Sequence, residues 1–110
     1  MKLKLISAVP AALLLAFALS GCGRNDDKLV MVTEATFPPY EFREGGKIVG
    51  IDVDLMKAVA KKTGRELVVE DMSFDSVIAA VQAGKADVAA SGITVTDERK
   101  RQVGFSRPYV

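Results

Sequence analysis

Apolar residues follow a changing period along the chain. After an apolar run from Leu5 to Leu19, short continuous apolar stretches alternate with segments in which apolar residues recur every three or four positions. Short continuous runs are typical of strands buried on both faces, and the longer spacing is typical of amphipathic helices. The pattern predicts strands near 29–33, 66–71 and 87–90, and helices near 53–63 and 75–83.

Polar residues and glycines mark the ends of the two predicted helices. Asp52 and Asp75 precede the periodic segments, and aspartate is a favoured N-cap residue because its side chain accepts hydrogen bonds from free backbone N–H groups. Gly64 and Gly84 follow the periodic segments and suit the left-handed conformation in which many helices end. Each helix is therefore expected to be bounded by an acid and a glycine.

A glycine pair and the order of elements indicate the fold class. Gly45-Gly46 lies between Glu41-Phe42 and Ile48-Val49-Gly50, which predicts a small β-hairpin. Single helices alternating with strands predict an α/β fold with a parallel sheet built from βαβ crossovers. Ligands bind such sheets at the C-terminal ends of the strands, so the loops that follow the strands are the expected place of function.

The first 22 residues resemble an export signal. A basic start, Met1-Lys2-Leu3-Lys4, precedes the apolar run, and Leu19-Ser20-Gly21-Cys22 is similar to the lipobox of bacterial lipoproteins, which is cut just before its cysteine. The run is shorter than the roughly 20 residues that span a bilayer, and Pro10 would weaken a permanent helix. The resemblance implies a signal peptide over 1–21, a lipidated Cys22 and a flexible tether over 22–27; a buried cysteine or an uncleaved anchor is the alternative.

Composition narrows the function classes. The 15 basic and 14 acidic residues are scattered, so no basic stripe is present and nucleic acid is not an expected partner. The chain has no histidine and one cysteine, which excludes Cys/His zinc clusters, internal disulfides and nucleophilic triads with an imidazole base. We expect no catalytic residue, metal or cofactor in this chain.

The loops after the predicted strands hold groups suited to an amino acid. Such a zwitterion needs donors for its carboxylate, acceptors for its ammonium group and a surface for its side chain. Arg99 offers a rigid fork that fits a carboxylate, Gly92 allows close approach of a backbone carbonyl, and Thr94 adds a hydroxyl. Phe37 and Phe74 are placed to face the ligand side chain.

Each of these residues also has a simpler interpretation. Arg99 lies in a charged segment where a solvated helix residue is common, and Ser91-Gly92 is a turn in many proteins. Phe37 and Phe74 are as readily explained as core residues. Pattern alone does not decide the function.

A family resemblance spans most of the chain after the leader. Five blocks occur in family order and resemble solute-binding protein family 3, the polar-amino-acid-binding proteins of ABC importers. The blocks are Ala35-Thr36-Phe37-Pro38-Pro39-Tyr40-Glu41-Phe42, Gly50-Ile51-Asp52-Val53-Asp54-Leu55, Gly84-Lys85-Ala86-Asp87-Val88, Gly92-Ile93-Thr94-Val95-Thr96-Asp97-Glu98-Arg99-Lys100 and Phe105-Ser106-Arg107-Pro108-Tyr109.

The resemblance implies how the ligand backbone and side chain are held. Arg99 would grip the carboxylate with the help of Thr94, and the carbonyl of Gly92 would accept from the ammonium group. Phe37 and Phe74 correspond to aromatic positions that sandwich the ligand. No catalytic role follows from any of these positions.

Three acids in the matching blocks or beside them have different expected roles. Glu34 lies where the family can carry a polar residue that selects the ligand side chain. Asp52 and Asp54 match the family text but are interpreted as a helix cap and a first-turn acid, and they are kept outside the site.

The resemblance also implies the architecture. Proteins of this family have two lobes and are roughly twice as long, so residues 28–110 are expected to form a periplasmic-binding-protein-like first lobe only, truncated before the second lobe. Binding by this part alone is expected to be weaker than by a closed pair of lobes.

The expected function is the extracytoplasmic substrate-binding component of an amino-acid ABC importer. It would be exported to the periplasm or cell surface, anchored to the membrane by lipid at Cys22, and would deliver a polar or charged amino acid to permease subunits. The alternatives are the same module in an enzyme, a prephenate-type dehydratase or a lytic transglycosylase, or in a sensory receptor. The resemblance leaves the identity of the amino acid open.

Overall fold

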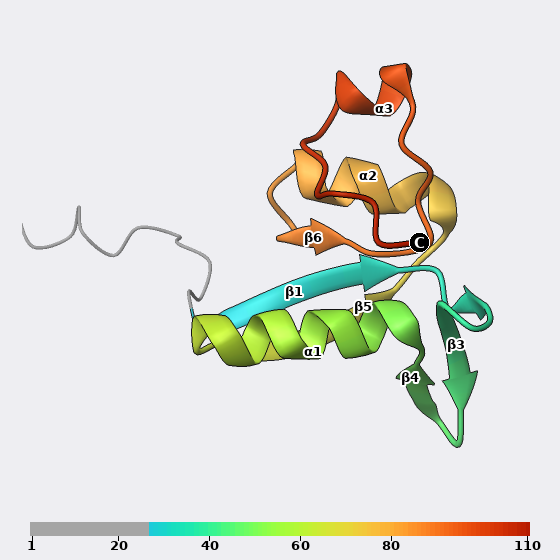
Figure 1. Ribbon diagram of the computed structural model, residues 1–110, viewed down its shortest axis with the longest axis vertical. Helices are drawn as coiled ribbons and strands as arrows, with labels where there is room; N and C mark the ends of the chain where they lie inside the picture. Colours follow the sequence, from blue (N-terminus) through green and yellow to red (C-terminus); the bar gives the residue numbers. More distant parts are fainter. Residues whose placement is uncertain (1–26) are drawn as a thin grey trace, which may run out of the picture.

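The computed structural model describes residues 27–110, which form a parallel three-stranded sheet, a small antiparallel sheet and three helices (Figure 1). The elements are β1 (Lys28–Thr33), β2 (Thr36–Phe37), β3 (Glu41–Glu44), β4 (Lys47–Val49), α1 (Ile51–Thr63), β5 (Glu66–Asp71), α2 (Phe74–Gln82), β6 (Val88–Ala89) and α3 (Asp97–Lys100). The α/β class predicted from the sequence is confirmed.

Strand β1 is the centre of the parallel sheet, whose order is β5-β1-β6. Its side chains alternate between two faces: Met31 packs with α1 residue Val53, and Val32 packs with α2 residue Val77. Helices α1 and α2 accordingly cover opposite sides of the sheet (Figure 1). This explains the continuous apolar run of β1, since a strand covered on both faces has no polar side.

The predicted hairpin is formed by β3 and β4, which turn at Gly45 and Gly46, both with positive φ. A further two-residue strand, β2, pairs with β3 and was not predicted. Its pairing depends on a partner strand rather than on any local apolar pattern, and Pro38-Pro39 follows it directly in the sequence. Together the three strands carry the chain from the end of β1 to the start of α1.

The N-terminus of α1 differs from the sequence prediction. The N-cap is Gly50, not Asp52, and the helix begins at Ile51. The first backbone N–H groups are satisfied by carbonyls instead of a side chain: Ile51 N donates to Pro39 O at 2.9 Å, and Asp52 N donates to Tyr40 O at 3.0 Å. The Asp52 carboxylate therefore makes no capping hydrogen bond to α1.

The prediction for α2 is also wrong at its start. Ser73 is the N-cap, and Asp75 lies in the first turn. The predictions for the C-terminal ends are closer, because Gly64 is the C-cap of α1 in the left-handed conformation (φ 68°) and the C-cap of α2, Ala83, directly precedes Gly84.

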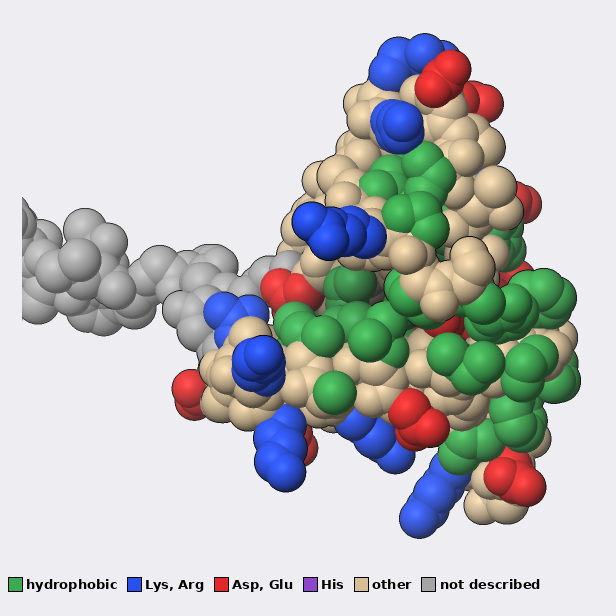
Figure 2. All heavy atoms as spheres, viewed as in Figure 1, with side chains coloured by type: hydrophobic (Ala, Val, Ile, Leu, Met, Phe, Trp, Pro, Cys, Tyr) green, Lys and Arg blue, Asp and Glu red, His purple; other side chains and the backbone are tan. Residues whose placement is uncertain are grey.

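Charge along α1 follows the helix direction. Asp52 and Asp54 lie in its first turn and Lys61 and Lys62 in its last, which complements the helix dipole. Figure 2 shows basic side chains around the C-terminal end of α1 and hydrophobic ones towards its N-terminal end. No helix among residues 27–110 is long and apolar enough to cross a membrane.

Candidate ligand-binding site

The six residues predicted to bind a ligand lie at one edge of the parallel sheet. Glu34 follows β1, Phe74 follows β5, and Gly92, Thr94 and Arg99 follow β6. Parallel strands end at the same edge, so these three loops meet there. The remaining residue, Phe37, reaches this edge from β2.

Glu34 connects the three loops. Its carboxylate accepts a hydrogen bond from the backbone N–H of Phe74 at the start of α2 and another from the hydroxyl of Thr36 at 3.0 Å. Its own backbone N–H donates to Ser91 Oγ at 2.9 Å. A negative charge at this helix N-terminus is favourable, because the free N–H groups carry partial positive charge.

Arg99 lies over Phe74 rather than extending away from the protein. Its guanidinium carbon is 5.3 Å from the centre of the Phe74 ring, which is cation–π distance. Arg99 Nη1 donates to the carbonyl oxygen of Thr94 at 2.8 Å, and Arg99 N donates to Thr96 Oγ1 at 3.1 Å. The Thr96 side chain therefore caps α3, and the half-buried guanidinium keeps most of its donors available for another acceptor.

Phe37 and Gly92 are in direct contact. Gly92 has φ of 55°, and a Cβ added there would stand 2.9 Å from the Phe37 ring, which is closer than packing allows. Phe37 is 51% exposed and stacks on Tyr40 with ring centres 5.1 Å apart. A largely exposed aromatic ring beside a bare backbone segment is suited to contact with a ligand.

A pocket of about 250 Å³ joins these groups. Four of the six predicted residues line it: Glu34, Phe37, Phe74 and Gly92. Three residues that were not predicted also line it: Thr36, Glu41 and Ser91. Thr94 lines a neighbouring hollow of about 550 Å³ that shares Phe37 and Gly92 with this pocket, and Arg99 is connected to the pocket through Phe74. The structure thus brings all six predicted residues into one region.

Two carboxyl groups near this pocket were not predicted to belong to the site. Glu41 is fully buried, and burial, followed by the neighbouring Asp52 carboxyl, raises the pKa of Glu41 to about 8. Asp52, which was interpreted as a helix cap, is also fully buried; its Oδ2 accepts from Gly92 N at 2.8 Å and its Oδ1 from Tyr109 Oη at 2.5 Å. The available signal was an acid set between apolar neighbours in each case.

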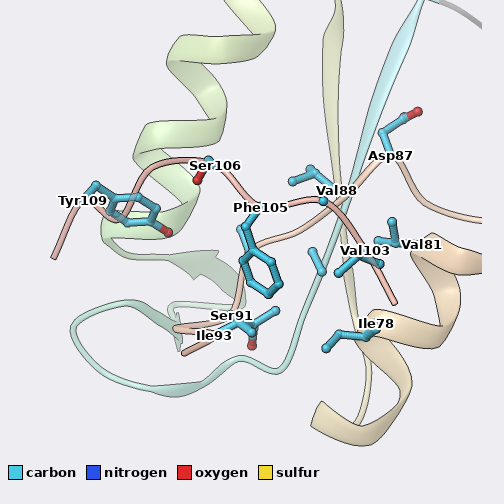
Figure 3. A pocket seen from close by; sticks show the side chains of 13 residues that line it. Ile78, Val81, Asp87, Val88, Ser91, Ile93, Val103, Phe105, Ser106 and Tyr109 are labelled. Atoms are coloured by element: carbon cyan, nitrogen blue, oxygen red, sulfur yellow. The ribbon is translucent and has the colours of Figure 1, made fainter. Parts of the chain in front are cut away.

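A separate pocket of about 170 Å³ lies between α2, β6 and the C-terminal segment. Figure 3 shows the Phe105 ring pointing from that segment towards Ser91 and Ile93, with Ile78 and Val103 nearby. None of the six residues predicted to bind a ligand lines it. Within residues 27–110 no cluster of acidic, cysteine or histidine side chains is arranged to hold a metal ion.

The fold and this edge of the sheet are those of a solute-binding domain. Residues 29–110 match the family of bacterial extracellular solute-binding proteins, family 3, and the chain belongs to that family. This confirms the resemblance drawn from the five sequence blocks.

Two curated relatives are similar to this chain over most of its length. The chain is 46% identical over 102 residues to the arginine-binding extracellular protein ArtP of Bacillus subtilis, covering 86% of this chain and 40% of ArtP. It is 37% identical over 102 residues to the ABC transporter arginine-binding protein 1 of Escherichia coli, covering 92% of this chain and 41% of that protein. The chain therefore spans less than half the length of these relatives.

Solved structures agree with the first-lobe assignment. An arginine-bound form of domain 1 from TmArgBP has a TM-score of 0.73 and 49% identity, covering 76% of this chain and 67% of that one. An ancestral arginine-binding protein bound to arginine has a TM-score of 0.74 and 52% identity, covering 76% of this chain and 38% of that one. The same kind of ancestral protein bound to glutamine matches with a TM-score of 0.74 and 50% identity, over 79% of this chain and 39% of that one.

Proposed function

We propose that this chain is the substrate-binding component of an amino-acid ABC importer and that its ligand is a cationic amino acid, with arginine the first to test. The relatives named above are binding proteins rather than enzymes, which supports a non-catalytic role. The observation that carries the proposal is chemical: an acid, Glu34, and two aromatic rings, Phe37 and Phe74, line one pocket, and the guanidinium of Arg99 lies over the Phe74 ring.

Each part of an amino acid has a counterpart in this arrangement. Arg99 is already oriented by Thr94 and Phe74, and its remaining donors would take the ligand carboxylate. The Gly92 carbonyl would accept from the ammonium group. Phe37 and Phe74 would flank the side chain, since a guanidinium or ammonium group stacks favourably on aromatic faces.

The acidic side of the pocket favours a positive side chain. Glu34 and Glu41 line it, and no lysine or arginine does. The charge of the Glu34 carboxylate raises the local concentration of cations in this partly enclosed pocket and disfavours anions. This selects cationic amino acids among the polar ligands that the family resemblance allows.

Export and anchoring belong to the same proposal. The division into a signal peptide (1–21), a lipidated tether (22–27) and a lobe (28–110) places Cys22 at the start of the mature chain, and the leader and Cys22 lie outside the described residues. The chain would then work at the outer side of a membrane and pass its ligand to permease subunits. Cys22→Ala should release the protein from the membrane fraction; a variant that stays bound would favour an uncleaved anchor.

The ligand site is tested by calorimetry with L-arginine on the purified chain. The arginine-bound structure of an isolated first domain supports measuring this chain by itself. Arg99→Ala should weaken binding by about 2 to 5 kcal/mol, which is tens- to thousands-fold in affinity, because a buried carboxylate loses its partner. Arg99→Lys should recover little of that loss, since an ammonium group cannot make the bidentate pair.

Arg101→Ala is the matched control, because Arg101 is an exposed arginine two positions further along the chain. Equal affinity of Arg99→Ala and Arg101→Ala would show that Arg99 is a solvated helix residue. Absence of arginine binding by the parent chain would count against the proposed function itself.

A further inference from the structure

Two acidic side chains are buried side by side beneath the ligand pocket. Glu41 and Asp52 both have 0% exposure. Glu41 is the first residue of β3 and Asp52 lies in the first turn of α1, and the hydrogen bond from Asp52 N to Tyr40 O at 3.0 Å ties the two segments together. Their proximity is therefore fixed by the backbone and not by a flexible contact.

The two carboxyls have unequal surroundings. Asp52 accepts from Gly92 N at 2.8 Å and from Tyr109 Oη at 2.5 Å, and it sits at the N-terminus of a 13-residue helix. Among residues 27–110, the one donor to the Glu41 carboxyl is Ser91 Oγ, 3.4 Å from Oε1, and no donor reaches its buried Oε2. The Asp52 carboxyl lies within hydrogen-bonding reach of Glu41. The described residues place no lysine or arginine in an ion pair with either acid.

Two adjacent buried carboxylates without a cation cannot both keep their charge, because neither water nor a counter-ion offsets the repulsion. The donors and the helix N-terminus favour charge on Asp52. The proton consequently belongs on Glu41. The other groups that face Glu41 agree: the charge of Glu34 also raises the pKa of Glu41, and only the hydroxyl of Ser91 lowers it.

Tyr109 completes the group from the C-terminal segment. Burial, followed by the Asp52 carboxylate, raises the pKa of Tyr109 well above its usual range, so the phenol remains a donor to Asp52. Of the two buried acids, Glu41 is therefore the one whose neutral form is favoured.

Glu41 is also close enough to the pocket for the charge of a bound ligand to affect its ionisation. It lines the pocket with Glu34 and Phe37, and a Cβ added at Gly92 would stand 3.7 Å from Glu41 Oε1. The carboxyl therefore lies directly behind the backbone that faces the pocket. A positive charge bound there would favour the ionised form of Glu41.

We propose that Glu41 is a positioning and specificity residue that shares one proton with Asp52, and that a cationic side chain bound in the pocket expels this proton. This inference rests on the proposed function and deepens it. The Glu41 O–H bond breaks, the proton passes to solvent, and the pocket gains one ligand charge as it gains one carboxylate charge. Glutamine, whose side chain is neutral, would leave the proton in place.

The exchange sets the pH dependence of binding. Below about pH 8 a cationic ligand must displace the proton from Glu41, and this cost falls as pH rises towards 8. Arginine affinity should therefore rise between pH 6 and pH 8, by at most about tenfold per pH unit for one linked proton. Glutamine affinity should stay nearly constant over the same interval.

The test is calorimetric titration of the chain with L-arginine and L-glutamine at pH 7 in buffers of different ionisation enthalpy. The two ligands share their α-groups, so the difference between them reports the side-chain charge. Arginine should release up to one proton more than glutamine. Glu41→Gln, which mimics the protonated acid in shape and hydrogen bonding, should still bind arginine but lose the extra proton release and the pH dependence.

Equal proton release with both ligands, or unchanged release in Glu41→Gln, would overturn the inference while leaving the proposed function intact. A second measurement needs no ligand: the infrared C=O band of a protonated carboxyl should be present at pH 7 in the parent and absent in Glu41→Gln. Its absence from the parent would overturn the shared proton directly. If neither amino acid binds, both the proposed function and the ligand-driven release of the proton are wrong. The infrared band then still shows whether Glu41 and Asp52 share a proton in the unliganded protein.

Discussion

The middle of the parallel sheet and its C-terminal edge are stabilised by different means. In the middle, β1 lies between two helices, and Met31, Val32, Val53 and Val77 are all at most 1% exposed. At the edge, the buried residues include polar ones: Thr33, Glu41, Asp52 and Ser91 are the buried polar residues of the part that the structure describes. Apolar packing fixes the scaffold, and buried hydrogen bonds fix the loops on it.

This difference explains why the candidate site lies at the C-terminal edge of the sheet. Apolar contacts are non-directional, so the middle of the sheet can hold elements together but cannot recognise a polar ligand. The edge exposes donors and acceptors, and the buried Asp52 and Ser91 side chains there both have hydrogen-bond partners. Substitutions in the two regions should therefore separate stability from binding.

The largest expected effect is on stability, in the middle of the sheet. Met31→Ala should lower the free energy of unfolding by about 2 to 5 kcal/mol, because it removes a fully buried side chain and leaves a cavity. Urea denaturation of the purified chain measures this loss. Leu55→Ala on the exposed side of α1, where Leu55 is 38% exposed, is the control and should change it by no more than about 1 kcal/mol. Equal losses would remove the distinction between packed and exposed apolar positions.

An intermediate effect is expected at the edge, and mainly on binding. Gly92→Ala places a methyl group against the Phe37 ring and forces an alanine to adopt φ of 55°. The strain should cost about 1 to 2 kcal/mol of stability, and displacement of Phe37 should weaken arginine binding at least as much. Gly104→Ala is the matched control, because an added Cβ there meets nothing within 4 Å. Unchanged affinity in Gly92→Ala, measured by calorimetry, would exclude this contact from the ligand site.

The smallest effect concerns an acid of the edge that is partly exposed. Asp71 accepts from Ala35 N at 2.9 Å and from Arg43 Nη2 at 2.9 Å, and the first of these contacts is the largest cause that lowers the pKa of Asp71 below 3.8. Asp71→Asn should reduce stability at pH 7 by less than about 1 kcal/mol, as is usual for exposed ion pairs.

The sign of the pH dependence of Asp71 follows from its lowered pKa. The ionised form stabilises the fold above pH 3.8, and this contribution is lost as pH falls towards the pKa of the folded state. The difference between parent and Asp71→Asn should therefore shrink in urea titrations repeated at about pH 3. A difference that grows at low pH would contradict this assignment.

Sequence patterns predicted the elements well where the signal was local. The three parallel strands, both long helices and the hairpin all appear, and α1 and α2 begin within two residues of the predicted positions. Local signals failed at the helix starts, because the donors of α1 are satisfied by Pro39 and Tyr40, which reach it through the antiparallel sheet. The residues next to Asp52 in the sequence do not indicate that backbone carbonyls from another segment satisfy these donors.

The candidate site divides in the same way. The sequence by itself predicted the α/β class and the loops that follow the strands, since these depend on spacing and residue type. Together with the family resemblance, it also singled out six candidate ligand-binding residues. Only the tertiary structure paired Glu41 with Asp52 and placed both beneath Gly92, 40 positions after Asp52 in the chain. Burial and the distance between two acids depend on how the backbone folds. The charge state of the pocket therefore could not be predicted from the sequence, because it depends on how β3 and α1 pack together.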